Sequence, residues 1–139
     1  MLRNPNVLLF VCDQEERTFL QELLRPHAEL TWVCNFHQLT ERLRQARYDA
    51  LFCKTPLCTG SWREVIQQVR LQFPNLPVII LSRTAGEREW LDVLEAGAFD
   101  LLAPPYLQRS LLSVLEHAVA SHEACVWHGS EECCKAKAS

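Results

Sequence analysis

Residues that could do chemistry stand directly after the apolar segments of this chain. Asp13 follows NVLLFVC, Lys54 follows DALFC, Ser82 follows VIIL, and Pro104 follows DLLA. In a sheet of parallel strands, the residues after the carboxyl ends of the strands meet along one edge, where ligands bind. A carboxylate attracts a hard cation, and an ammonium or a hydroxyl can contact a phosphoryl group. A lysine directly after so apolar a strand needs an explanation.

Two other arrangements suggest enzyme chemistry, and their spacing opposes both. Cys58 and Arg63 in CTGSWR are one residue too close for the C-x5-R loop of cysteine phosphatases, so the arginine would point elsewhere. No G-x-x-x-x-G precedes Lys54-Thr55, which excludes a P-loop. The first turn, CDQEER, has no glycine, which argues against dinucleotide binding. A structural or solvated Cys58 is favoured, and a small cysteine-dependent enzyme using Cys58 is the third hypothesis for function.

Residues 123–139 are rich in histidine and cysteine but show no periodicity, which predicts a flexible C-terminal tail. His122 and Cys125 are three residues apart and could bind zinc from one helical face. The spacing, however, matches no familiar zinc finger, and adjacent cysteines such as Cys133 and Cys134 seldom both bind one metal. We therefore expect exposed thiols and no metal in the tail.

Short apolar segments alternate with amphipathic ones along most of the chain. Near-continuous apolar runs are typical of strands buried on both faces of a parallel sheet. Such strands are expected at residues 6–12, 29–33, 49–53, 78–81 and 100–103. An amphipathic helix is expected after each one. Five β–α units in order predict an α/β fold with a five-stranded parallel sheet sandwiched by helices, flavodoxin-like in topology.

Capping residues locate the helices. Asn35 is expected to cap the second helix, while Ser61 and Thr84 begin capping boxes for the third and fourth. Gly97 is expected to end the fourth helix in the left-handed conformation, and the last helix should run over about residues 107–121. The first helix lies in EERTFLQELLRP, and its inward face is expected to consist of Phe19, Leu20, Leu23 and Leu24.

Length, charge and cysteine content exclude several classes of protein. The 139 residues, 48% of them apolar and 22% charged, fit one globular domain. A net charge of −3 gives no basis for binding nucleic acid or an anionic membrane. No apolar run approaches the ~20 residues that span a bilayer. Seven cysteines without disulfide spacing suit reduced thiols, so a cytoplasmic protein is expected.

Over roughly residues 5–120, the chain resembles the receiver domain of two-component response regulators, the CheY-like family. The resemblance rests on VCDQEE, YDALFC, PVIILS and LEAGAFDLLAPPY in this order and spacing. Working members of the family hold Mg²⁺ with an acidic pair after the first strand and phosphorylate an aspartate that ends the third. A Ser or Thr after the fourth strand and a Lys after the fifth contact the phosphoryl group. Pro105 matches the family's proline, whose preceding peptide bond is usually cis.

Only Asp13 and Ser82 remain of that set of residues. Cys12 stands at the first acidic position, Lys54 at the phosphorylated aspartate and Pro104 at the lysine. An ammonium cannot form an acyl phosphate, and it repels a divalent cation. The resemblance therefore implies a degenerate receiver, a pseudo-receiver, that holds neither metal nor cofactor.

Two hypotheses explain Lys54 itself. Its charge could occupy the Mg²⁺ site and pair with Asp13, with an attraction of about 4 kcal/mol at ~4 Å and an effective dielectric near 20. The cost of desolvation could cancel that gain. Alternatively, Lys54 extends into water from a loop.

A surface for partners is expected on the fourth helix, fifth strand and fifth helix, the face that similar receivers use for docking or dimerisation. Leu91 and Leu94 are expected to face inward, leaving Trp90 at the edge of that helix. Trp90 and Tyr106 are candidate anchors, since half-exposed aromatics favour interfaces. A purely structural role for Trp90 is equally open. Leu101 stands where an aromatic switch residue is common, so coupling to that surface should be lost.

We therefore expect residues 1–122 to form a receiver-like domain and residues 123–139 a tail. The expected function is that of a stand-alone signalling module of the two-component or phosphorelay type, which is not an enzyme and is not phosphorylated. It would act through protein contacts with a kinase, an effector or a second copy of itself. The alternative is an atypical receiver that a histidine kinase still regulates.

Overall fold

The computed structural model describes residues 4–55, 61–82, 86–103 and 106–128, with side chains up to residue 121. The strands are β1 (Asn6–Phe10), β2 (Glu29–Val33), β3 (Ala50–Thr55), β4 (Val78–Ser82) and β5 (Asp100–Leu102). The helices are α1 (Gln14–Leu24), α2 (Phe36–Gln45), α3 (Trp62–Gln72), α4 (Glu87–Ala96) and α5 (Gln108–His128). Strands and helices alternate, as expected.

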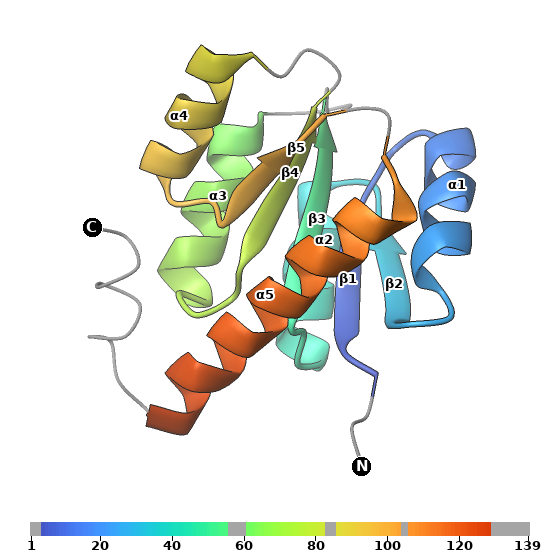
Figure 1. Cartoon of the computed structure of the whole chain (residues 1–139). Coiled ribbons are helices and arrows are strands. Elements are labelled where there is room, and N and C mark those ends of the chain that lie inside the picture. The colour runs from blue at the N-terminus through green and yellow to red at the C-terminus, as the bar shows by residue number, and fades with distance from the viewer. Residues whose placement is uncertain (1–3, 56–60, 83–85, 104–105, 129–139) are drawn as a thin grey trace.

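The five strands form one parallel sheet in the order β2-β1-β3-β4-β5 (Figure 1), which confirms the predicted fold. Helices α1 and α5 cover one face, and α2, α3 and α4 cover the other. The strand order reverses between β1 and β3, so their carboxyl ends open the crevice where ligands bind in sheets of this type. The chemistry-bearing residues that follow the strands meet at this edge.

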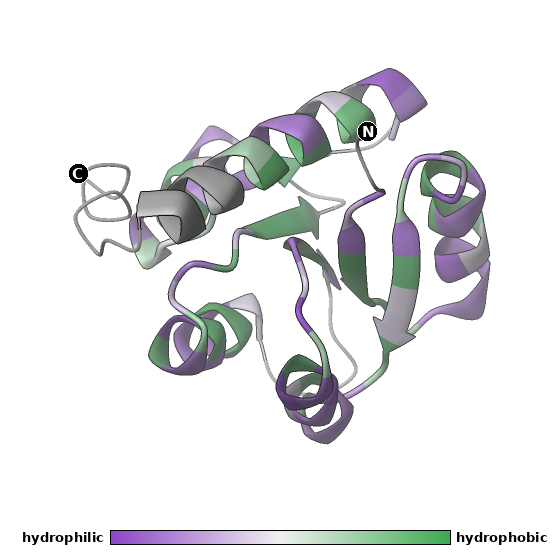
Figure 2. Cartoon of the chain, turned by 90° about the horizontal axis from the view of Figure 1, so that it is seen from below, coloured by the Kyte–Doolittle hydropathy of each residue, from purple (hydrophilic) through white to green (hydrophobic). Residues whose placement is uncertain are grey.

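Side chains of the central strands alternate between two apolar cores. Val7 and Leu9 pack with α1 and α5, whereas Leu8 and Phe10 pack with α2, α3 and α4. The helices turn hydrophobic residues toward the sheet and hydrophilic residues outward (Figure 2). Because helices cover both faces of the sheet, nearly every residue of a central strand is buried. This explains why the strands are continuous apolar runs in the sequence.

Three of the predicted helix ends are confirmed. The Asn35 side chain accepts a hydrogen bond from the Gln38 backbone N–H at 2.8 Å, and Ser61 Oγ accepts one from the Glu64 N–H at 3.5 Å. Gly97 ends α4 with φ 111°, in the left-handed region. These contacts satisfy backbone groups that a helix leaves unpaired at its ends.

Other predictions about the helices were wrong. Helix α4 begins after Gly86, not at the box of Thr84, which lies outside the described residues. Phe19 is exposed, because it lies about 100° around α1 from the inward Leu20. Leu91 is also exposed, and Val93 is the residue of α4 that is fully buried.

The boundaries of three further elements differ from the prediction. Strand β1 ends at Phe10, whereas β3 continues through Lys54 to Thr55. Helix α5 reaches His128, so residues 123–128 are helical and do not belong to a flexible tail as predicted. Residues 129–139, which include Cys133 and Cys134, lie outside the described residues, as do Pro104 and Pro105.

Substituting alanine at Gly97 should destabilise the protein by about 1–2 kcal/mol, because L-residues avoid the left-handed conformation. A Cβ there would also meet the guanidinium of Arg70, which must move aside. Gly86→Ala is the matched control, since its Cβ would meet nothing within 4 Å and the residue has φ −106°. Chemical denaturation of the two variants checks the difference. Equal losses would contradict it.

Candidate functional site

Lys54 is buried inside strand β3, although a charged residue was expected in the loop beyond it. Its side chain is 5% exposed, and it lies beside Leu81 of β4, next to the pair Thr55–Ser82. An isolated charge at such a position would cost several kcal/mol. The site must therefore supply partners for the ammonium group.

Among the described residues, three groups lie around the Lys54 ammonium. Nζ lies 3.3 Å from Glu16 Oε2, donates to the Thr55 carbonyl at 3.2 Å, and lies 5.7 Å from the ring centroid of Tyr106. A carboxylate, a carbonyl and an aromatic face all favour a cation. Both hypotheses for Lys54 were therefore wrong: it neither reaches open water nor pairs with Asp13.

Glu16 rather than Asp13 is the partner because of the way α1 begins. The Asp13 side chain accepts a hydrogen bond from the Glu15 N–H at 3.1 Å and so caps the helix. Glu16 lies one turn before Leu20 on the inward face, which brings it over the end of β3. The i, i+4 spacing from Glu16 to Leu20 was the available signal in the sequence, and sequence reasoning missed it.

Cys12 holds a neutral thiol where an acidic residue was expected from the resemblance. Its Sγ donates to the Cys34 carbonyl at 3.2 Å, and Cys34 Sγ lies 3.9 Å from the Val11 carbonyl. On the neighbouring strand, burial and, to a lesser extent, the nearby Cys12 raise the pKa of the Cys53 thiol far above its usual range. Cys53 thus stays protonated and contributes no negative charge to the site.

Ser82 ends β4 as a buried residue and contacts α4. Its hydroxyl donates to Glu89 Oε1 at 2.7 Å. The neighbouring Thr55 hydroxyl donates to the Leu81 carbonyl at 3.2 Å. The Ser82 hydroxyl therefore connects the end of the sheet to the first turn of α4.

These residues do not fit Mg²⁺, the ion that the receiver family holds at this edge. Mg²⁺ requires clustered oxygen ligands, usually carboxylates. Here the Glu16 carboxylate is paired with the Lys54 ammonium, and the Asp13 carboxylate caps α1. Cys12 has a thiol in place of an oxygen ligand. Within the described ranges, no three His, Cys, Asp or Glu residues form a group that could hold a metal ion.

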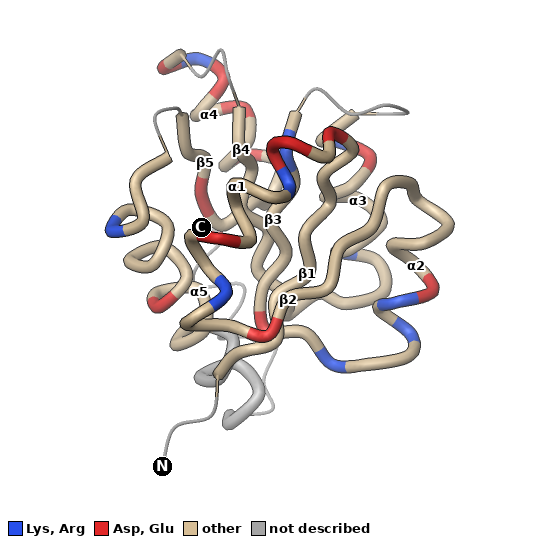
Figure 3. Tube along the Cα trace, turned by 90° about the vertical axis from the view of Figure 1, so that its right-hand side faces the viewer, with Lys and Arg blue, Asp and Glu red and all other residues tan. Residues whose placement is uncertain are grey.

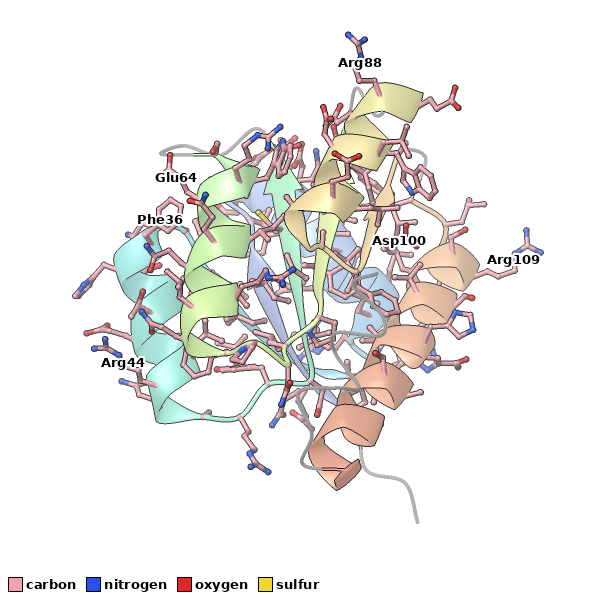
Figure 4. The ribbon with its side chains drawn as sticks, turned by 90° about the vertical axis from the view of Figure 1, so that its left-hand side faces the viewer. Phe36, Arg44, Glu64, Arg88, Asp100 and Arg109 are labelled. Atoms are coloured by element: carbon pink, nitrogen blue, oxygen red, sulfur yellow. The ribbon has the colours of Figure 1, made fainter. Side chains whose placement is uncertain are left out.

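The residues predicted for the partner surface separate into two environments. Trp90 on α4 is 41% exposed, and its Nε1 donates to Asp100 Oδ1 at 3.3 Å, where Figure 4 shows Asp100 beside α4. Tyr106 is half-buried against the α1–α5 core and close to Lys54. Leu101 is buried in the opposite core. The structure therefore does not bring Tyr106 onto an open surface.

Comparison with known proteins places these features in context. No known protein-family profile matches the chain. The transcriptional regulatory protein ZraR of Escherichia coli is 25% identical over 118 residues, which are 84% of this chain and 27% of that protein. ZraR of Klebsiella oxytoca is 26% identical over 117 residues, which are 81% of this chain and 26% of that protein. The chain thus spans about a quarter of the length of these relatives.

Solved structures agree on the fold. The signal receiver domain of an HD domain-containing protein from Pseudomonas fluorescens has a TM-score of 0.79 at 20% identity, covering 88% of this chain and 99% of that one. The receiver domain of a sensor histidine kinase from Pseudomonas aeruginosa has a TM-score of 0.75 at 23% identity, covering 85% and 99%. That structure contains magnesium in its active site cleft. This chain therefore has the fold of response-regulator receiver domains.

Across the part of the chain that is described, no helix has both the length and the apolar character needed to cross a membrane.

Removing Glu16 should destabilise the protein more than removing the charge it faces. Glu16→Ala leaves the Lys54 ammonium buried without its carboxylate, at a cost of about 2–3 kcal/mol, less than for a fully buried pair because Glu16 is 22% exposed. Lys54→Met should cost less, since Glu16 can turn toward water. Urea denaturation measures both variants.

Glu22→Ala, an exposed carboxylate on the same helix, is the control and should change stability by no more than about 0.5 kcal/mol. Equal stability of Glu16→Ala and Glu22→Ala would show that the ion pair contributes nothing.

Proposed function

We propose that this chain is a receiver-like signalling module of the two-component or phosphorelay type that is not phosphorylated and acts through protein contacts. The observation that carries the proposal is the buried Lys54–Glu16 ion pair at the end of β3. It lies at the position where the resemblance would place a phosphorylated aspartate. Similarity to a transcriptional regulatory protein and to the receiver domain of a sensor histidine kinase supports the two-component setting.

Electrostatics at the edge of the sheet support the absence of phosphoryl transfer. Acyl phosphate formation needs a carboxylate as nucleophile and a cation to neutralise the phosphoryl oxygens. The Glu16 carboxylate is already neutralised by Lys54 at 3.3 Å, and Cys12 leaves the cation without its second acidic ligand. The module is thus proposed to catalyse no reaction of its own and to need no cofactor.

The contacts of α4 support a surface with one conformation. Ser82 donates to Glu89, and Trp90 donates to Asp100, so α4 is hydrogen-bonded to both β4 and β5. In a switchable receiver, the Ser or Thr would instead turn to the phosphoryl group. Without a ligand that distinguishes two states, no shift in population is available. The α4 surface would then be able to bind a partner at all times, whether a kinase, an effector or a second copy of the chain.

The alternatives receive less support. A receiver still regulated by a histidine kinase would need another acceptor at the same edge. The cysteine-dependent enzyme rests on Cys58, which lies outside the described residues. A cytoplasmic location fits the proposed setting and the reduced thiols of Cys34 and Cys53.

The protein should take up no phosphoryl group from acetyl phosphate in the presence of Mg²⁺, because no free carboxylate occupies position 54. Intact mass spectrometry after incubation should show the unmodified mass, while a conventional receiver domain under the same conditions gains a phosphoryl adduct. A stoichiometric adduct that hydroxylamine removes would identify an acyl phosphate and overturn the proposal. Peptide mapping would then locate the acceptor.

Trp90→Ala should weaken capture of the native partner about tenfold or more while the unfolding temperature changes little. A half-exposed tryptophan is a common interface anchor, and its loss typically costs about 2 kcal/mol or more of binding. Leu71→Ala on α3 is the control, because Leu71 is also an exposed apolar residue but lies off α4. Affinity capture from the native host and thermal unfolding measure both effects. Unfolding with normal binding at low temperature would make Trp90 a core residue.

A further inference from the structure

The two edges of the sheet differ in how well they are protected against pairing with another strand. Strand β5 has three residues, too few to offer a useful edge. Strand β2, with five residues, forms the other edge beside α1 (Figures 1 and 3). Its sequence ELTWV contains no proline and no lysine, the residues that natural proteins place on edge strands to prevent pairing. An unprotected edge of this kind is a template for a further strand.

The hydrogen-bond pattern fixes which residues of β2 face outward. The Glu29 N–H donates to the Pro5 carbonyl, and the Val33 carbonyl accepts from the Val11 N–H. Alternate residues of a strand bond to a given neighbour, so Glu29, Thr31 and Val33 pair with β1. The N–H and C=O groups of Leu30 and Trp32 then point away from the sheet. Among the residues described, none donates to or accepts from them on that side.

Trp32 is unusual for an exposed strand position. Its side chain is 39% exposed, and the Arg17 guanidinium lies 3.4 Å from the ring centroid. Alternation along β2 places Trp32 and Leu30 on the same face, the one that α1 covers. Beside Leu30 lies a groove of about 460 Å³ lined by Gln21, Arg25, Ala28, Glu29 and Leu30.

We propose that β2 pairs with β2 of a second copy of this chain, antiparallel and around a twofold axis that passes between the Thr31 residues of the two copies. In this register, Leu30 of each copy lies opposite Trp32 of the other, and these two residues are the ones with outward backbone groups. Each pair exchanges two N–H···O=C bonds, which gives four across the axis. The two sheets become one continuous sheet of ten strands, twice the five of one chain.

The side chains of β2 match this register. Trp32 of the second copy stands next to Leu30 on the α1 face, above the groove of the first copy. There Arg25 is available to contact the indole, as Arg17 does within one chain. Thr31 meets its own counterpart on the other face, a favourable cross-strand pair. Glu29 lies opposite Val33, so no like charges meet along the strand.

This self-complementarity is the reason to favour a second copy over an extended segment of another protein. An isologous interface requires one patch to supply both an anchor and the groove that receives it. Strand β2 supplies the anchor and, together with the end of α1, the groove, and the outward groups lie symmetrically about Thr31. The inference is independent of phosphorylation and of the α4 surface.

Sedimentation velocity over a range of micromolar concentrations tests the proposal on the full chain under reducing conditions. The wild-type protein should show a dimer, and Trp32→Ala should raise its dissociation constant about tenfold or more, since the anchor is lost. Leu71→Ala is the control, because Leu71 is also an exposed apolar residue but lies on α3 rather than on β2 or α4, and it should leave the constant unchanged. Leu30→Pro removes an outward N–H without removing a bond to β1, and it should also weaken the dimer.

A disulfide cross-linking test identifies the register in which the two β2 strands pair. It does not depend on whether the Trp32 variant folds. Thr31→Cys should form a disulfide between two copies on mild oxidation with oxidised glutathione, since opposed Cα atoms in such pairs are ~4.5 Å apart. Thr18→Cys, at an exposed position on α1, adds the same thiol elsewhere and should give no more cross-linking than the wild type. Peptide mapping should find position 31 joined to position 31.

Three results would overturn the proposal. The first is a monomer at all concentrations. In that case an extended segment of another protein would be the remaining candidate to pair with β2. The second is a dimer that Trp90→Ala disrupts and Trp32→Ala does not. The third is equal cross-linking of the Thr31 and Thr18 variants.

Discussion

The edge of this sheet is organised around the need to compensate one buried positive charge. Lys54 is a residue of a strand that is otherwise apolar, and its ammonium is shielded from water. Such a charge is tolerated only with a paired counter-charge and further polar contacts. The carboxylate comes from α1, the carbonyl from β3 and the aromatic ring from the segment before α5. The starting point of α1, which brings Glu16 to the ammonium, and the position of Tyr106 are therefore both needed to compensate the buried charge of Lys54.

Under the proposed function, the receiver fold is kept without the receiver reaction. The fold depends on apolar strands, helix caps and two hydrophobic cores, which are all present. The reaction depends on negative charge at the end of β1 and β3. A thiol and an ammonium stand there instead, and neither disturbs the packing below them. Burial of apolar side chains preserves the architecture, while in the proposed function two side chains at the end of the sheet decide the chemistry.

The fold was predictable because its signals are local. Apolar runs marked the strands, and Asn35, Ser61 and Gly97 marked helix ends through contacts within a few residues. The partner of Lys54 was not predictable in this way, since charged residues usually end a strand and Asp13 was the nearest acid in the resemblance. Its identity depends on the rotation of α1 against the sheet. That rotation also exposed Phe19, so both errors have one origin.

The first turn of helix α4 is held by a hydrogen bond from the end of the sheet and not by a capping side chain. Gly86 precedes it without any side chain to accept a backbone N–H, and the third helical residue, Glu89, reaches back to Ser82. A helix end held this way cannot fray independently of the strand that holds it. The end of β4 and the start of α4 should therefore form one cooperative unit in local unfolding, protected from hydrogen exchange to the same degree.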